Sequence, residues 1–198
     1  MKKYIHPHYF RLIIDRIRNS YTQYYSRFLA RWWGVKIGHG SKFNGVPIFR
    51  VLPGTSIKIG NNATFNSSHS SNLIGVYTPS MLSTITRLGH IQIGDNCGFS
   101  GTVIASALCI TIGNNVRCGA NTLITDTDWH TDDYRTGKDK SVTIEDNVWL
   151  GYGVKVLKGV TIGKNSLIGA GSIVTHDIPA NVVAAGNPCK IIKQLKTH

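Results

Sequence analysis

Four residues that could take part in catalysis lie within five positions of one polar segment: Asp126, Asp128, Trp129 and His130. A neutral imidazole has a pKa of about 6.5, so a positioned histidine can take a proton from a substrate group at neutral pH. Either aspartate could orient the imidazole, or could only cap a turn. The cluster predicts general-base chemistry at His130, while a hydrogen bond within the loop is the alternative role for this histidine.

A six-residue repeat surrounds this cluster and predicts the fold that must position it. After the cluster, apolar residues fall at intervals of six: Ile144, Leu150, Val156, Ile162, Ile168 and Val174. Shorter matches precede it: Ile37 and Phe43, Ile59 and Phe65, Ile93 and Phe99, then Ile112, Cys118 and Ile124. A period of six fits neither an α-helix nor a plain strand. It is typical of a parallel β-helix, in which three short flat strands form each coil and the coils stack on one another.

Two stretches interrupt the repeat. The gap from Ile124 to Ile144 is twenty residues, which is not a multiple of six, and it holds the acidic segment. We expect a loop at about 126–141 that leaves the β-helix and carries the cluster, because loops on rigid scaffolds often carry function. A second irregular stretch, from Ser67 to His90, is rich in serine and contains proline, and we expect it to interrupt the early coils.

The N-terminal part of the chain has a different period. Its apolar residues recur at spacings of three and four from about Pro7 to Trp33, which predicts an amphipathic helix. The arm contains a single acidic residue, Asp15. Its basic residues are Lys2, Lys3, Arg11, Arg16, Arg18, Arg27 and Arg31. The helix could pack on its own domain or oligomer with solvated arginines, or its basic face could rest on anionic lipid.

These patterns divide the chain into three parts. We expect a helical arm at 1–35, the β-helix at 36–180 with its loop at about 126–141, and a short basic tail at 181–198 whose end could be helical. The early coils give weaker matches than the coils after Ile93, so their number is not fixed by the repeat.

The composition and charge of the chain indicate which binding partners and which cellular compartment to expect. The 22 Lys and Arg residues against 10 Asp and Glu give a formal charge of +12, which favours an anionic partner such as a phosphate-bearing cofactor or a membrane surface. We expect no nucleic-acid partner, because no known nucleic-acid-binding motif is present. The four cysteines lack C-x-x-C spacing and are expected to be reduced core residues. Arg11 and Asp15 interrupt the only early apolar run, so we expect a cytoplasmic protein that could touch the inner face of the membrane through its arm.

Roughly the last hundred residues resemble the hexapeptide-repeat acyltransferases, especially the sugar O-acetyltransferase branch with the maltose, galactoside and capsule or exopolysaccharide acetyltransferases. The resemblance rests on two stretches, IGNNVRCGANTLITDTDWH and VTIEDNVWLGYGVKVLKGVTIGKNSLIGAGSIVTHDIPANVVAAGNPCKII. It implies an all-β, left-handed parallel β-helix and a homotrimer. It also implies an acetyl-CoA-dependent O-acetyltransferase that acts on a sugar or polysaccharide-precursor hydroxyl in polysaccharide biosynthesis.

The resemblance also implies roles for individual residues. His130 takes the place of the family's catalytic histidine, which removes a proton from the acceptor hydroxyl as that hydroxyl attacks the thioester carbonyl. The acceptor side comprises Asp126, Asp128, Trp129, Ser100 and Asn121. The positions that match the coenzyme A groove between subunits are Trp149, Gly151, Tyr152, Ala170, Thr175, His176, Lys190 and Lys193. Tyr152 departs from the small residue common in the family, and a backbone amide near it is the candidate oxyanion donor.

Alternatives are left open at several of these positions. The small residues of the groove could let a pantetheine arm approach the backbone, or could only turn corners, and the two tail lysines could meet phosphates or stay solvated. A xenobiotic alcohol or an amino-sugar amine could be the acceptor instead, because one fold hosts many functions. A non-catalytic β-helix binding module is the alternative from another class. We expect no metal, because the histidines lack ligand-like spacing.

Overall fold

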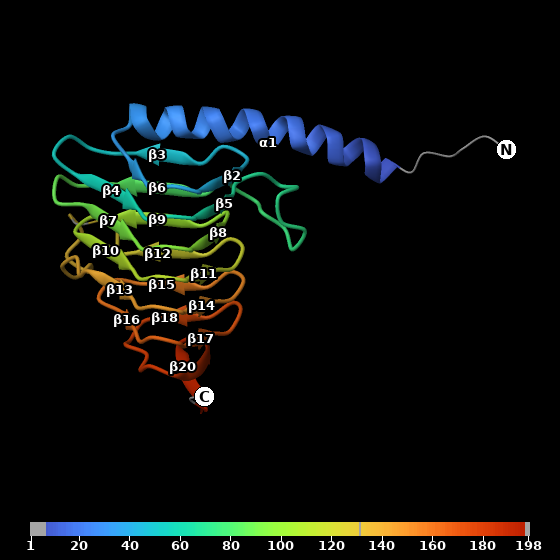
Figure 1. Ribbon diagram of the computed structural model, residues 1–198. Coiled ribbons are helices and arrows are strands. Elements are labelled where there is room, and N and C mark those ends of the chain that lie inside the picture. Colours follow the sequence, from blue (N-terminus) through green and yellow to red (C-terminus); the bar gives the residue numbers. More distant parts are fainter. Residues whose placement is uncertain (1–6, 131, 197–198) are drawn as a thin grey trace.

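The protein forms a stack of coils with one long helix lying across its N-terminal end (Figure 1). A computed structural model describes residues 7–130 and 132–196. Three sheets, called A, B and C, run along the stack, and each coil contributes one strand to each sheet in turn. The predicted left-handed parallel β-helix of hexapeptide repeats is therefore confirmed. The parts of the arm and tail at 1–6 and 197–198 lie outside the described residues.

Within the described chain, six successive coils supply the strands of the three sheets. Sheet A contains β1 (Lys36–Ile37), β4 (Ser56–Ile59), β7 (His90–Ile93), β10 (Cys109–Ile112), β13 (Val142–Ile144) and β16 (Thr161–Ile162). Sheet B contains β2 (Lys42–Asn44), β5 (Thr64–Asn66), β8 (Gly98–Ser100), β11 (Arg117–Cys118), β14 (Trp149–Leu150) and β17 (Leu167–Ile168), followed by β19 (Val182–Gly186) and β20 (Cys189–Gln194). Sheet C contains β3 (Ile48–Arg50), β6 (Met81–Thr84), β9 (Val103–Ser106), β12 (Leu123–Thr125), β15 (Lys155–Val156) and β18 (Ile173–Val174).

The hexad residues form ladders inside the stack. Each apolar hexad residue pairs with its equivalent in the next coil, as Ile112 does with Ile144 in sheet A and Ile124 with Val156 in sheet C. In sheet B the rings of Phe43, Phe65 and Phe99 stack with centroids 5.4 and 5.0 Å apart. Burial of these ladders removes apolar surface from water in every coil, which is the main favourable contribution to the stability of such a stack.

The corners of the coils depend on residues that accept a left-handed backbone. Seven asparagines there have positive φ: Asn62, Asn96, Asn115, Asn121, Asn147, Asn165 and Asn181. Asparagine tolerates this conformation better than branched residues do. Side chains of successive corners also bond to each other, with Asn147 Nδ2 donating to Asn165 Oδ1 at 3.1 Å and Asn165 Nδ2 donating to Asn181 Oδ1 at 2.8 Å. Asparagine therefore serves both the backbone conformation of these corners and the contact between them.

The predicted N-terminal helix is α1 (Pro7–Trp32), and it covers the open end of the first coil. Near the C-terminal end of the helix, Ala30 is buried in the core and Leu29 packs against it, and the preceding turns make polar contacts with the first coil. Thr22 Oγ1 donates to the carbonyl of Phe43 at 3.0 Å, and Gln23 Nε2 donates to the carbonyl of Ser41 at 2.8 Å while its Oε1 accepts from the amide of Phe43 at 2.9 Å. These side chains satisfy backbone groups that an open sheet edge would otherwise leave unpaired.

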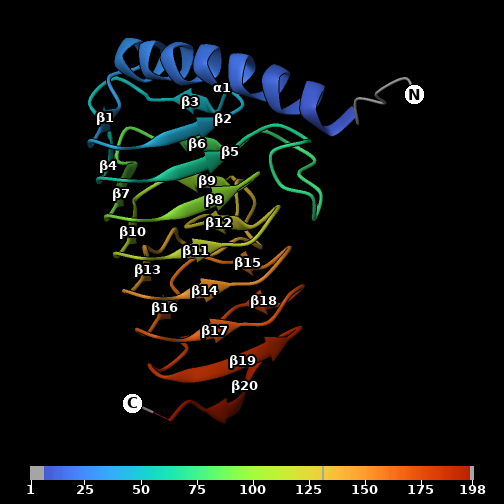
Figure 2. The ribbon, with the colours of Figure 1, turned by 45° about the vertical axis from the view of Figure 1, so that its right-hand side comes forward.

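The other end of the stack is closed by strands. β19 continues sheet B in parallel with β17, and β20 turns back to pair with β19 in antiparallel fashion (Figure 2). The suggested helix at the end of the chain is therefore wrong. The free edge of β19 offers unpaired backbone N–H and C=O groups, and Cys189–Gln194 pairs with them as a strand instead of forming a helix. The β-structure therefore extends beyond residue 180, where the β-helix was predicted to end.

The cysteines are free, as expected. Cys97, Cys118 and Cys189 are buried, and Cys109 is partly buried. Burial raises the pKa of the Cys97 thiol to about 11, and burial likewise raises the pKa of Cys118, which belongs to the inner ladder of sheet B. Both are neutral, unreactive thiols at physiological pH.

Candidate active site

The loop that carries the predicted histidine leaves the stack at the end of β12 and returns at β13. Its base is closed by two backbone hydrogen bonds, from the amide of Lys140 to the carbonyl of Asp126 at 3.0 Å and from the amide of Gly159 to the carbonyl of Lys140 at 2.9 Å. The predicted excursion from the β-helix at about 126–141 matches this loop, in which residue 131 lies outside the described residues.

Asp126 anchors the loop to the preceding coil. Its carboxylate is fully buried and accepts from the amide of Ala107 at 2.6 Å, the amide of Leu108 at 2.9 Å and the hydroxyl of Ser106 at 2.9 Å. These bonds satisfy the carboxylate and fix the corner between sheets C and A. The structure thus gives Asp126 a capping contact, and its roles toward the imidazole and the acceptor stay predictions.

The backbone of the loop is strained next to the histidine. Trp129 has φ = 72°, and the other described non-glycine residues with positive φ are all asparagines. A bulky aromatic residue rarely adopts this conformation, and such outliers concentrate at functional sites. The amide of Trp129 is held by the hydroxyl of Thr127 at 3.1 Å, and the side chains of Trp129 and His130 are exposed.

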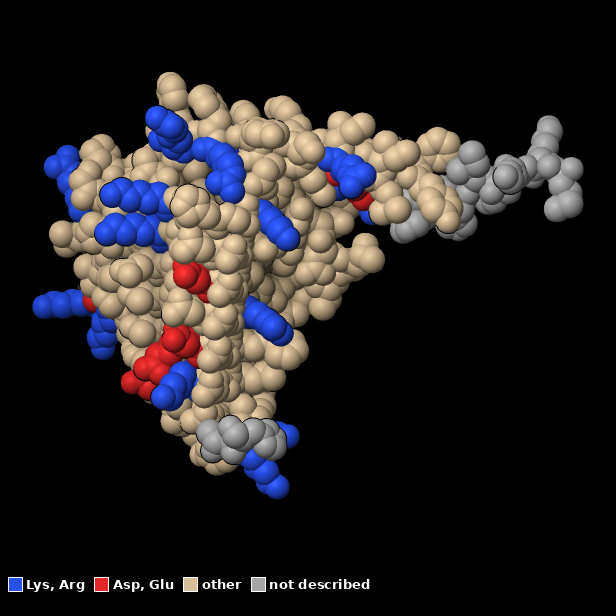
Figure 3. Space-filling model, viewed as in Figure 1, with Lys and Arg blue, Asp and Glu red and all other residues tan. Residues whose placement is uncertain are grey.

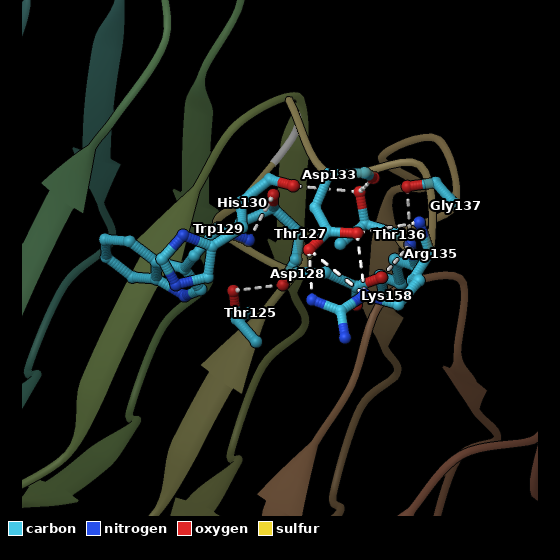
Figure 4. A network of polar contacts seen from close by, with 10 residues as sticks. All are labelled: Thr125, Thr127, Asp128, Trp129, His130, Asp133, Arg135, Thr136, Gly137 and Lys158. Carbon is cyan, nitrogen blue, oxygen red and sulfur yellow. Dashed lines mark hydrogen bonds and ion pairs between the residues drawn. The ribbon is translucent and has the colours of Figure 1, made fainter.

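The next coil fixes Asp128 and the segment around His130. Lys158 Nζ lies 2.5 Å from Asp128 Oδ2 and also donates to the carbonyl of Gly137 at 2.7 Å (Figure 4). The carbonyl of His130 accepts from Thr136 Oγ1 at 2.9 Å, so the main chain at His130 is held inside the loop. Lys158 was not predicted as part of the site, because it stands 30 residues after Asp128 and no local pattern links the two.

A groove of about 420 Å³ lies on the outer surface at the other end of sheet C, where sheet B turns into sheet C. Four residues predicted for the acyl donor line it: Trp149, Gly151, Tyr152 and Ala170. The opposite wall comes from the irregular stretch before β6, through Asn72 and Ile74. That wall was not predicted, although the break in the repeat after Phe65 marked the segment as irregular.

Two of the residues predicted for the acceptor side, Asn121 and Ser100, hold that wall in place. Asn121 Oδ1 accepts from the amide of Tyr77 at 3.0 Å, and its Nδ2 donates to the carbonyl of Gly75 at 2.8 Å. Ser100 is buried, and its hydroxyl accepts from Asn66 Nδ2 at 3.0 Å and Asn72 Nδ2 at 3.2 Å. The structure thus gives both side chains structural partners, and direct contact with an acceptor stays a prediction.

The phenol of Tyr152 reaches the same wall. It hydrogen-bonds Tyr77, and this bond raises the pKa of Tyr77 above its ordinary value. The groove is therefore bounded by an aromatic bridge rather than by the small residue common at this position in the resembled family. The backbone at Tyr152 still lies against the groove.

The glycines of the groove allow neighbouring coils to pack closely against each other. A Cβ at Gly151 would stand 2.6 Å from the amide nitrogen of Ala170 in the next coil, and one at Gly169 would stand 2.8 Å from the Cβ of Ala185. Only glycine permits this approach of neighbouring coils. Ala170, by contrast, is exposed and borders open groove.

The remaining predicted donor residues lie elsewhere. Thr175 and His176 follow β18 at the edge of sheet C that also carries the His130 loop, and Thr175 Oγ1 lies 2.8 Å from His176 Nδ1. Lys190 and Lys193 are exposed on β20, paired with Ala185 and Val183.

The predicted site is therefore divided between two edges of one face. β12 pairs directly with β15, so the His130 loop after β12 and the Tyr152 corner before β15 stand in adjacent coils but at opposite ends of sheet C. One hexad of extended chain, about 20 Å, separates them. Within one chain the structure brings the groove residues together and leaves His130 at the far edge.

The stacked coils and the repeat define the chain as a hexapeptide-repeat β-helix protein. Residues 141–176 match the family model "Bacterial transferase hexapeptide (six repeats)".

Among curated proteins, the chain is similar to the galactoside O-acetyltransferases of Lactococcus lactis, at 48% identity over 111 residues, and Escherichia coli, at 45% over 112 residues. These matches cover 54% of this chain and 53% and 55% of the two relatives. The chain thus spans about half the length of these relatives. A solved hexapeptide-repeat acetyltransferase from Vibrio cholerae covers 92% of the chain, with a TM-score of 0.58 and 26% identity, and 86% of its own chain is matched.

Proposed function

We propose that the protein is an acetyl-CoA-dependent O-acetyltransferase that acts on a sugar or polysaccharide-precursor hydroxyl, with His130 as general base. The observation that carries the proposal is the presentation of His130: an exposed imidazole on a loop that is anchored by Asp126 and Lys158 and strained at Trp129. The likeness to two galactoside O-acetyltransferases supports a sugar hydroxyl as acceptor. The solved structures of similar fold include complexes with acetyl-CoA and with coenzyme A, which supports the acyl donor.

The chemistry needs one proton to move and one acyl group to be transferred. The imidazole of His130 takes the hydroxyl proton as the acceptor oxygen attacks the thioester carbonyl. The carbon–oxygen ester bond forms, the carbon–sulfur bond breaks, and the imidazolium returns its proton to the departing coenzyme A thiolate. A backbone amide at the Tyr152 corner would stabilise the negative charge that develops on the carbonyl oxygen.

We further propose that two copies of the chain build each site. Sheet C has an apolar outer row, formed by the register partners Ile48, Met81, Val103, Leu123 and Ile173 and interrupted by Lys155. The corresponding row of sheet A is polar: Lys36, Lys58, Gln92, Thr111, Thr143 and Thr161. Burial of sheet C in a closed ring would therefore remove apolar surface from water.

Such a ring also completes the divided site. If three copies face their common axis with sheet C, the edge with the groove in one copy meets the edge with His130 in the next. His130, Thr175 and His176 then come from one subunit, and Trp149, Tyr152 and Ala170 come from its neighbour. A homotrimer of this kind would hold three shared sites, one at each contact between neighbouring subunits.

The test is an assay of thiol release from acetyl-CoA with a panel of free sugars, nucleotide-linked sugars, an amino sugar and a non-sugar alcohol. Release should occur with a sugar acceptor and should fall by about a hundred- to ten-thousandfold in His130→Ala, as expected for the loss of a general base. His39→Ala is the matched control, because His39 is an exposed histidine on the first coil. Activity of His130→Ala within a few-fold of the wild type would contradict the role of His130. Transfer only to the amino group or the non-sugar alcohol would contradict the acceptor class.

A further inference from the structure

The helix α1 turns a mainly polar face toward the protein, with Ala30 and Leu29 packed on the core near its end, and turns its largest apolar side chains away from it. Thr22, Gln23 and Ser26 lie on the face that contacts the first coil, and Ser26 is fully buried there. The opposite face consists of large apolar and aromatic side chains that are 57–77% exposed: Phe10, Ile14, Ile17, Tyr21, Tyr24, Phe28 and Trp32. This orientation is the reverse of that expected for a surface helix packed on its own core.

The apolar face is long and continuous. Its members recur every three or four residues from Phe10 to Trp32, so they form one stripe about 33 Å long on the helix. Tyr21 and Tyr25 stack on each other at 5.6 Å, and Phe28 packs beside Trp32 at 6.0 Å, which fills the stripe without gaps. Soluble monomers rarely expose an apolar patch of this extent, and such patches mark interaction surfaces.

Arginines border the stripe on both sides. At 100° per residue, Arg11 and Arg18 lie along one border and Arg31 lies along the other, with Arg16 set back on that side toward the first coil. The single acid of the described helix, Asp15, lies on the side of the protein body and is already paired with Arg18 at 2.6 Å and Arg11 at 3.7 Å. In Figure 3 most of the acidic side chains in view lie on the later coils, away from the end that α1 covers.

We propose that α1 lies flat in the interface of an anionic lipid bilayer, with its apolar stripe among the acyl chains and its arginines at the lipid phosphates. An apolar face rich in Tyr, Trp and Phe between cationic borders is the pattern of an interfacial helix. Among the described residues no helix is long and apolar enough to cross a membrane, so α1 rests on the bilayer. The stripe side chains are exposed, whereas Thr22 and Ser26 on the other side of the helix are buried. The membrane and the first coil, above which the helix lies in Figure 2, would therefore contact opposite sides of the helix.

A second copy of the chain fits this face less well than lipid does. A two-fold contact between stripes would bring the arginine borders of one helix against those of the other, with no free acid on the described helix to neutralise them. Anionic headgroups supply the missing charge. If the proposed trimer forms with its axis along the stack, its three helices all lie at the same end, and the three contacts reinforce one another.

The experiment is co-sedimentation of the full-length protein with vesicles of phosphatidylcholine alone and of equal parts phosphatidylcholine and phosphatidylglycerol. Binding should be strong to the anionic vesicles, weak to the neutral ones, and reduced by salt. Ile17→Gln/Phe28→Gln should lower the partition coefficient by at least about a hundredfold through lost burial, and glutamine keeps the helix propensity. Arg16→Gln/Arg31→Gln should lower it by about thirtyfold.

The control is Lys164→Gln/Lys196→Gln, which removes two exposed positive charges from the far end of the stack and should bind like the wild type. Thiol release with a soluble acceptor should be unchanged in all three double variants, so a failure of lipid binding and a failure of the proposed activity are separate results. Absence of wild-type binding to anionic vesicles would overturn the proposal. So would equal binding by the helix variants, or a doubling of the wild-type particle mass that Ile17→Gln/Phe28→Gln abolishes, since a second copy would then occupy the stripe.

Discussion

The regular coils after residue 141 and the loop before them differ in what holds them together. In the coils, Ile144, Leu150 and Val156 are fully buried, and each pairs with its equivalents in the neighbouring coils. In the loop, most bonds are local and exposed, such as that between Arg135 and Asp133, and the body is reached through a few anchors, Asp126 and Lys158 among them. The repeat therefore supplies stability, and the interruption supplies reactive groups in a fixed position.

The largest effect expected from this difference is on the free energy of unfolding of a ladder variant. Leu150→Ala removes a fully buried side chain from the middle of sheet B and should lower the free energy of unfolding by about 2–5 kcal/mol. His130→Ala, in the exposed loop, should leave it within about 0.5 kcal/mol of the wild type. Urea denaturation followed by circular dichroism measures the free energy of unfolding of both variants. If both lost the same free energy of unfolding, the claim that the coils and not the loop supply the stability would be contradicted.

A smaller effect is expected at the anchor where loop and coil meet. Asp126→Asn replaces one acceptor oxygen by an amide that must face backbone N–H groups, and it should cost about 1–3 kcal/mol of stability. Leu108→Ala is a control in the same corner that keeps the backbone donors. If Asp126→Asn were as stable as the wild type, the buried carboxylate would not be an anchor that stabilises the junction of loop and coil.

The smallest effect on stability is expected at the ion pair between loop and coil. Lys158→Met should change the free energy of unfolding by less than about 1 kcal/mol, because Asp128 is 42% exposed and solvent screens the pair. The rate of acetyl transfer should still fall by roughly ten- to a hundredfold, because the loop around His130 loses its tether. Lys138→Met, which changes an exposed lysine of the loop itself, should keep the full rate.

The sequence predicted the features that follow from a local period. The six-residue repeat gave the β-helix, the twenty-residue gap gave the loop, and the spacing of three and four gave α1. It did not predict contacts between coils: Lys158 with Asp128, or Asn121 with the Gly75–Tyr77 segment, each join residues about 30 to 46 positions apart. The end of the chain was misjudged for the same reason, since Cys189–Gln194 becomes a strand only because β19 offers it an edge.

The division of the site between two edges of sheet C also follows only from the fold. In sequence, His130 and Tyr152 stand 22 positions apart, and nothing indicates which edge each will occupy. The pairing of β12 with β15 places them at opposite ends of the same face. If both edges belong to one active site, as proposed, they must meet across a subunit contact.

Complementation between two inactive variants tests this claim most directly. His130→Ala keeps the groove, and Ala170→Trp fills the groove but keeps the histidine, so each alone should be inactive in acetyl transfer. If the chains are unfolded and refolded together in equal amounts, half of the subunits supply an intact His130 edge and half an intact groove. About one quarter of the shared sites, half of one half, should then regain full activity. A mixture as inactive as its two components, with mixed trimers demonstrated by mass, would contradict a site built from two copies of the chain.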